Sequence, residues 1–248
     1  MKAFVTGVGG QLGFDVMKEL INRGYEVMGV DIAPSPDSGM PYIQMDITNG
    51  PLVEQILNMV KPDVVFHCAA WTAVDLAEDA DKQALVRAIN VDGTANIAAV
   101  CKKLDCKLVY LSTDYVFDGR GETPWEPDCK TYAPLNVYGQ SKLDGELAVS
   151  GMLEKYFIVR IAWVFGRNGN NFVKTMLNVG KNMIRCGWSM TRSVRLPIPL
   201  IWPACWWIWC RQSNTVTTMP PMKAAISAGM SLLVRSSVRQ VMPRRWCR

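Results

Sequence analysis

Two short stretches of this sequence hold residues whose types and spacing suit acid–base chemistry. Tyr138 and Lys142 are four residues apart, so on a helix they share one face, about one turn from each other. A free tyrosine has a pKa of about 10, and a nearby ammonium is expected to lower it and also to hold a ribose hydroxyl. Thr113 follows an apolar run and can donate a hydrogen bond to a carbonyl oxygen. The alternative is an exposed helix start with an ordinary tyrosine and lysine.

A glycine-rich turn near the N-terminus suits the binding of a phosphate group. Gly7 permits a tight turn, Gly10 lets the backbone approach a pyrophosphate, and Gly13 lets a helix pack closely on a strand. A second strand, 25–31, ends in Asp31, which is placed to hydrogen-bond an adenosine ribose. The acid favours NAD, although a neighbouring Arg or Lys could accept the phosphate of NADP. A purely structural turn, with Asp31 capping a loop, is the alternative.

The elements that position these residues alternate between strand and helix. Apolar runs predict strands at 3–6, 25–31, 63–68, 107–112 and 157–161, and helical spacing predicts helices at 14–23, 52–59 and 82–103. Buried strands separated by helices indicate an α/β fold with a Rossmann-type doubly wound parallel sheet. Such sheets bind ligands beyond the carboxyl ends of their strands, where the polar clusters of this sequence fall, so we expect one shared site.

Cysteine and histidine usage argues against a zinc-type metal site. The eight cysteines form no CxxC pair and His67 is the only histidine. A reduced, cytoplasmic setting fits this pattern. The N-terminus shows no charged and then apolar leader of the secretory type.

Charge and tryptophan divide the chain into two parts near residue 182. All 22 acidic residues lie within 1–182, whereas 183–248 holds 10 of the 27 basic residues and six of the nine tryptophans. A basic, aromatic segment suggests nucleic acid binding, and 196–210 suggests a membrane segment. The latter is too short and too interrupted by proline to span a bilayer. We predict neither a nucleic acid nor a membrane partner.

Several motifs in the first part resemble the extended short-chain dehydrogenase/reductase family, in particular its members that act on dTDP-sugars. The matching segments are VTGVGGQLG at the glycine turn, MDIT at 45–48, AAWTAVDLAE at 69–78, LSTDYVFDG at 111–119, PLNVYGQSKLDGE at 134–146 and RIAWVFG at 160–166. The resemblance covers about residues 1–182. It implies reduction of the 4-keto group of dTDP-4-dehydro-L-rhamnose to dTDP-L-rhamnose with NADPH or NADH.

The same resemblance implies roles for individual residues. Tyr138 would protonate O4, Lys142 would tune Tyr138 and hold the nicotinamide ribose, and Thr113 would polarise the carbonyl. The other residues that it assigns to the cofactor are Gly7, Gly10, Gln11, Leu12, Gly13, Asp31, Asp46, Ile47, Ala69, Ala70 and Thr72, and those that it assigns to the sugar are Val74, Asp75 and Trp163. Trp71 stands where a tyrosine is expected, and Trp163 is as well suited to core packing as to a sugar platform.

Rival functions remain open within and beyond this family. An epimerase or dehydratase for nucleotide sugars would keep the glycine turn, Tyr138 and Lys142. A non-catalytic regulatory subunit of the methionine adenosyltransferase type also resembles the family, although intact Thr113, Tyr138 and Lys142 favour an enzyme. Family members often form homodimers or use magnesium, and the sequence decides neither point.

The family pattern stops at Met183, where we expect a stretch like DxxRVVNDQxGTPTY. When the codons of 183–193 are regrouped one base earlier, they permit Asp-Thr-Val-Arg-Val-Val-Asn-Asp-Gln-Ile, and 194–199 permits Gly-Thr-Pro-Thr-Tyr-Thr. Residues 217–226 likewise permit Tyr-Tyr-His-Ala-Thr-Asn-Glu-Gly-Gly-Tyr. We therefore predict an NAD(P)-binding Rossmann domain at 1–182 and an out-of-frame tail at 183–248. The substrate lobe would be missing or non-native, and the activity of this chain impaired.

Overall fold

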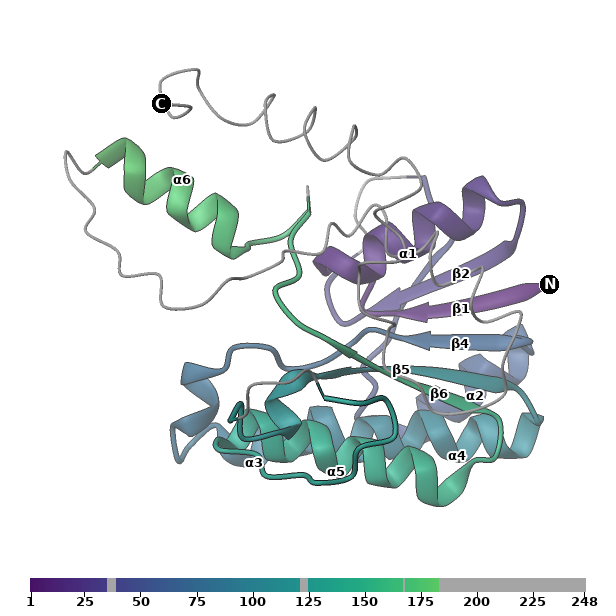
Figure 1. Cartoon of the computed structure of the whole chain (residues 1–248). Coiled ribbons are helices and arrows are strands. Elements are labelled where there is room, and N and C mark those ends of the chain that lie inside the picture. Colours follow the sequence, from purple (N-terminus) through teal and green to yellow (C-terminus); the bar gives the residue numbers. More distant parts are fainter. Residues whose placement is uncertain (35–38, 121–124, 167, 183–248) are drawn as a thin grey trace.

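The computed structural model describes residues 1–34, 39–120, 125–166 and 168–182, which form a six-stranded parallel sheet (Figure 1). The strands are β1 (Lys2–Thr6), β2 (Glu26–Asp31), β3 (Tyr42–Gln44), β4 (Val64–His67), β5 (Lys107–Thr113) and β6 (Tyr156–Ile161). Their order in the sheet is β3-β2-β1-β4-β5-β6, with every neighbouring pair parallel. This is the strand order of a dinucleotide-binding Rossmann sheet, so the expected fold is confirmed.

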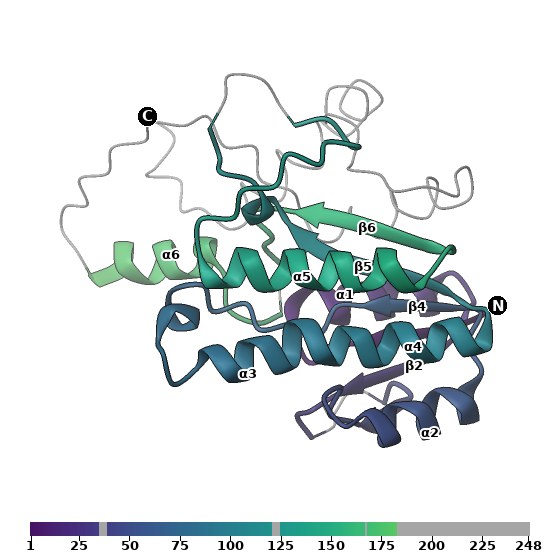
Figure 2. The same cartoon turned by 90° about the horizontal axis from the view of Figure 1, so that it is seen from below.

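Helices cover both faces of the sheet. The helices are α1 (Gln11–Asn22), α2 (Gly50–Val60), α3 (Gln83–Arg87), α4 (Thr94–Leu104), α5 (Val137–Met152) and α6 (Phe172–Asn182). Figures 1 and 2 show α1 on one face of the sheet and α2, α4 and α5 on the other. Right-handed crossovers explain this division. The connection from β1 to β2 moves across the sheet in one direction, and the connections from β3 to β6 move in the other.

A separate hydrophobic core lies on each face. Under α1, Met17 packs with strand residues such as Val5 and Phe66. Under α2, α4 and α5, strand residues Phe4 and Leu108 pack with Ile97 of α4. Because the strands are buried on both faces, they are near-continuous apolar runs, which explains why the sequence revealed them.

The helix expected over 82–103 is interrupted in the structure. A π-helical turn, η2 (Ala88–Gly93), separates α3 from α4. At Gly93, an added Cβ would lie 2.8 Å from Ile47 Cδ1, so this turn packs directly against the loop after β3. Turns of this kind occur frequently at functional sites, and the buried side chain of Asn90 in η2 is hydrogen-bonded to Trp71 and Ser141, next to the site described below.

Four elements were not predicted, namely β3, α6 and the short 3-10 turns η1 (Asp75–Glu78) and η3 (Asp114–Val116). β3, η1 and η3 are only three or four residues long, whereas α6 is as long as α2 and was overlooked. The predicted out-of-frame tail at 183–248 lies outside the described residues. Within the residues that are described, no helix is both long enough and apolar enough to cross a bilayer.

Candidate active site

The glycine turn is built as a close junction of β1, α1 and the loop after β4. Gly7 has a φ of +72°, and a Cβ there would lie 2.6 Å from the Ala69 backbone nitrogen. A Cβ on Gly13 would overlap the carbonyl oxygen of Gly7. Only glycine satisfies both conditions, so the junction of β1, α1 and the loop after β4 requires it, and the exposed positions of the turn are Gly9 and Gly10.

The N-terminus of α1 is open to an anion. Its N-cap residue is Gly10, so no side chain caps the helix, and its first turn carries no acidic residue. The first backbone N–H groups of a helix lack intrahelical partners and carry a partial positive charge. This cradle therefore fits the pyrophosphate of a dinucleotide.

The loop after β6 is fastened to the glycine turn. The Asn168 side-chain amide donates to the Gly10 carbonyl oxygen at 3.2 Å, and the Asn171 amide donates to Gln11 Oε1 at 2.8 Å. Neither asparagine was predicted to belong to the site, although the Gly- and Asn-rich composition of this loop is typical of a turn.

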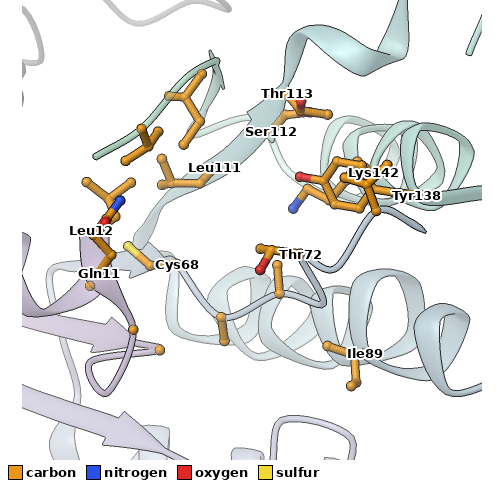
Figure 3. Close-up of a pocket in the computed structure, with 18 of the residues that line it drawn as sticks. Gln11, Leu12, Cys68, Thr72, Ile89, Leu111, Ser112, Thr113, Tyr138 and Lys142 are labelled. Atoms are coloured by element: carbon orange, nitrogen blue, oxygen red, sulfur yellow. The ribbon is translucent and has the colours of Figure 1, made fainter. Parts of the chain in front are cut away.

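A cavity of about 1120 Å³ runs along the carboxyl ends of the strands. Its lining includes the expected residues Gly7, Gly10, Gln11, Leu12, Gly13, Asp31, Asp46, Ile47, Ala69, Ala70, Thr72, Val74, Thr113, Tyr138, Lys142 and Trp163. Figure 3 shows Gln11 and Leu12 at one side and Tyr138 and Lys142 at the other. Of the residues assigned to the site, Asp75 alone is not in this lining, because it begins η1 and is exposed to solvent. Trp163 is 46% exposed and packs edge-on against Phe172, so it is not a core aromatic.

The three residues assigned to catalysis come from two elements. Thr113 ends β5, whereas Tyr138 and Lys142 lie on α5, whose start is fixed by the Asn136 side chain accepting from the Gly139 N–H at 2.7 Å. The Thr113 side chain lies near enough to Tyr138 to lower the pKa of its phenol. Tyr138 and Lys142 both extend toward the cavity (Figure 3).

The Tyr138 pKa shifts in the direction opposite to the expected one, and Lys142 is not among the causes of the shift. Burial raises the pKa of Tyr138 to about 12, and this outweighs the effect of Thr113, which lowers it. Burial also lowers the pKa of Lys142 to about 7, and its Nζ lies over the Tyr110 ring, 4.2 Å from the ring centre. In this geometry the phenol is the acid form at neutral pH, which suits proton donation.

The burial of Lys142 predicts a stability that depends on pH. An unfolded lysine has a pKa of 10.5, above the folded value of about 7, so the unfolded chain binds the extra proton between these values and stability falls as pH falls. Lys142→Met removes the loss of stability that the uncharged lysine causes at low pH. We therefore expect its free energy of unfolding to exceed that of the wild type by on the order of 2–4 kcal/mol at pH 7, and by a smaller amount at pH 10. Urea unfolding at the two pH values measures the difference. Lys103→Met, which alters an exposed ion pair, is the control. A difference in the free energy of unfolding between Lys142→Met and the wild type that does not vary with pH would contradict the prediction.

A buried chain of hydrogen bonds supports the loop after β4. Thr6 Oγ1 accepts from the Ala69 N–H at 3.0 Å and lies 2.8 Å from His67 Nδ1, while His67 Nε2 lies 3.0 Å from Thr94 Oγ1, which donates to the Asn90 carbonyl. The Thr94 hydroxyl proton is therefore already used, which assigns the ring proton to Nε2. Burial lowers the pKa of His67 to about 3, so the ring stays neutral. Among the described residues, no group of three His, Cys, Asp or Glu side chains could hold a metal ion.

Asn90 is a further supporting residue that the sequence analysis did not identify. Its Oδ1 accepts from the Trp71 N–H at 2.8 Å, and its Nδ2 donates to Ser141 Oγ at 2.9 Å. It thereby ties the loop that carries Thr72 to the helix that carries Lys142. The available signal was a buried amide within an otherwise apolar helical spacing, since such a group needs partners.

This geometry agrees with the comparisons to known proteins. The model of the family described as RmlD substrate binding domain matches residues 1–185. The chain belongs to this family. The matched residues of the RmlD family include every described element.

Relatives within the RmlD family carry reductase names. A dTDP-4-dehydrorhamnose reductase of Aggregatibacter actinomycetemcomitans is 38% identical over 182 residues, which are 73% of this chain and 58% of that protein. The crystal structure of a Clostridium acetobutylicum dTDP-4-dehydrorhamnose reductase has a TM-score of 0.78 at 34% identity, and the match covers 88% of this chain and 74% of that one. The Bacillus anthracis reductase in complex with NADP has a TM-score of 0.74 at 32% identity, with coverages of 88% and 74%. The chain thus spans under two thirds of the length of the Aggregatibacter enzyme.

Proposed function

We propose that residues 1–182 are the cofactor-binding and catalytic part of a reductase that converts dTDP-4-dehydro-L-rhamnose to dTDP-L-rhamnose. The observation that carries this proposal is the single cavity that Thr113, Tyr138 and Lys142 share with the glycine turn. The reductase names of the relatives support the substrate class.

Each catalytic group has a role that follows from its position. NAD(P)H, when bound over the glycine turn, supplies the hydride that reduces the keto carbon. Tyr138 donates its proton to O4, and its neutral form at pH 7 suits that step. Thr113 donates a hydrogen bond to the same oxygen as negative charge develops there. Lys142 holds the nicotinamide ribose, and Val74 and Trp163 face the sugar from the cavity lining.

We also propose that 183–248 is translated out of frame, through a genuine indel or a sequencing error. A lobe that would clamp the dTDP group is then missing, and since positioning carries much of an enzyme's rate, this chain turns over slowly. The nucleotide sequence across codons 180–185 tests the frame directly. A cytoplasmic setting is part of the proposal, and a homodimer and magnesium use are left to experiment.

The test of function compares this chain with a version whose reading frame is restored after Asn182. Both are incubated with dTDP-4-dehydro-L-rhamnose and either NADH or NADPH, and cofactor oxidation and sugar products are followed. We expect dTDP-L-rhamnose from the restored version and little from this chain. A product with an inverted or dehydrated ring would instead indicate an epimerase or dehydratase. Cofactor binding without turnover, together with capture of an adenosylmethionine synthetase, would indicate a regulatory subunit.

A further inference from the structure

The turn η1 ends in an acid, Glu78, whose side chain contacts the start of α5. Glu78 Oε1 accepts from the Val137 N–H at 2.7 Å, although the two residues are 59 positions apart. Val137 is the first residue of α5 and directly precedes Tyr138. This hydrogen bond therefore joins the loop after β4 to the helix turn that carries the proposed general acid.

The bond from Glu78 completes the N-terminus of α5. The first backbone N–H groups of a helix lack intrahelical partners, and a carboxylate that accepts from one of them stabilises the first turn. Asn136 Oδ1 accepts from the Gly139 N–H at 2.7 Å, and Glu78 accepts from the Val137 N–H. The residues on either side of Tyr138 are therefore both held by side chains from outside the helix.

The loop that carries Glu78 also forms part of the cavity wall. Val74, which faces the sugar in the proposed function, lines the cavity and directly precedes η1. Nearer β4, Asn90 joins the same loop to Ser141 of α5, and Ser141 Oγ donates to the Tyr138 carbonyl oxygen at 2.7 Å. The bond from Glu78 is a second link between this loop and α5, on the other side of Tyr138.

We propose that Glu78 is a positioning residue, which holds the turn that carries Tyr138 in place against the wall that carries Val74. Glu78 is exposed and lies outside the cavity lining, so it acts through the backbone of α5. A general acid must lie within hydrogen-bond reach of the oxygen that it protonates, and a displacement of about 1 Å can cost on the order of 10²-fold in rate. The inference rests on the proposed function, because it concerns where the Tyr138 hydroxyl lies relative to the keto oxygen.

Three substitutions of Glu78 in the frame-restored version test the role of its acceptor oxygen. Glu78→Ala removes the acceptor, so we expect kcat to fall roughly tenfold or more, with the NADH dissociation constant within about twofold of the parent value. Glu78→Gln keeps an oxygen at the same reach and should restore most of kcat. Glu78→Asp keeps the charge but is one methylene shorter, so it should resemble Glu78→Ala.

Calorimetry separates a displaced acid from a loss of folded protein, because the stoichiometry of NADH binding reports the folded fraction of each variant. Asp79→Ala is the matched control, since it removes the same charge from the adjacent exposed residue. Its kcat should equal that of the parent. Full kcat in Glu78→Ala, or a kcat in Glu78→Gln as low as that in Glu78→Ala, would overturn the inference.

Hydrogen exchange in the full chain tests the link to α5 without requiring turnover. In Glu78→Ala, amide exchange followed by mass spectrometry should be about threefold faster, or more, in peptides that cover the start of α5, and unchanged in peptides that cover α1. Asp79→Ala should leave both unchanged. Equal exchange at the start of α5 in Glu78→Ala and the wild type would overturn the inference.

The outcomes separate this inference from the proposed function. Faster exchange in Glu78→Ala, without keto-sugar reduction by the frame-restored version, would contradict the function and leave the link between Glu78 and α5 intact. Reduction that Glu78→Ala does not slow would support the function and overturn the inference.

Discussion

Tyr138→Phe should lower turnover of the frame-restored enzyme by roughly 10²–10⁴-fold, because it removes the general acid and keeps the ring. The ring of Tyr138 packs edge-on against Tyr115, with centroids 5.8 Å apart, and phenylalanine preserves this contact. The loss should therefore appear in kcat, with NADH binding little changed. Steady-state rates of NADH oxidation, together with calorimetric binding of NADH, measure the two effects separately.

Tyr156→Phe is the matched control for this experiment. Tyr156 begins β6 and packs against the core under α4 and α5, so its hydroxyl lies away from the cavity. The Tyr156→Phe variant should have a turnover within about twofold of that of the frame-restored enzyme, since it alters no group at the reacting centre. If Tyr138→Phe also keeps more than a tenth of the activity, another group supplies the proton and the proposed mechanism is wrong.

Glu146→Gln should destabilise the domain by about 3–5 kcal/mol, because it leaves a buried guanidinium without its counter-charge. Glu146 Oε1 and Oε2 accept from Arg160 at 2.8 and 2.6 Å, and the two side chains are only 2% and 4% exposed. Arg160 Nη1 has no hydrogen-bond partner among the described residues, and the contacts that remain, the Tyr132 hydroxyl at 3.1 Å from Nη2 and the rings of Phe117 and Tyr132, carry no negative charge. Urea unfolding at pH 7 gives the difference in free energy.

The double variant Glu146→Leu with Arg160→Met separates a lost charge pair from general damage to the core. Removing both charges should recover most of the stability, because no unpaired ion is left buried. Lys103→Met, at an exposed pair 2.6 Å long, should cost about 1 kcal/mol or less. If the free energy of unfolding of Glu146→Gln lies within about 1 kcal/mol of the wild-type value, the pair does not stabilise the packing of α5 on β6 as its burial indicates.

Most strands of the sheet were predictable because each is a short run of consecutive apolar residues. Strands buried on both faces must be apolar throughout, the glycine turn directly follows β1, and Asp31 ends β2. The three residues of β3 give no such run, and it was missed. The break between α3 and α4 was also missed; there Gly93 packs against Ile47, a contact between segments far apart in the chain that local spacing does not reveal.

Which residues form the site was easier to predict from the sequence than their pKa values. Motif positions placed Thr113, Tyr138 and Lys142 at one cavity, as found. The direction of the Tyr138 pKa was wrong, because depth of burial depends on the whole packing of α5 and not on a spacing of four residues. Asp75 begins the turn η1 and lies outside the cavity lining, and its role toward the sugar stays a prediction.

The fastening of Asn168 and Asn171 to the glycine turn has a consequence for how the domain matures. The residues joined are about 160 positions apart, so these two hydrogen bonds form only when the segment after the last strand has reached the glycine turn. A nascent chain that already carries all its glycines would still lack them. A nucleotide bound over the glycine turn would in turn favour the folded state in which the two segments are joined.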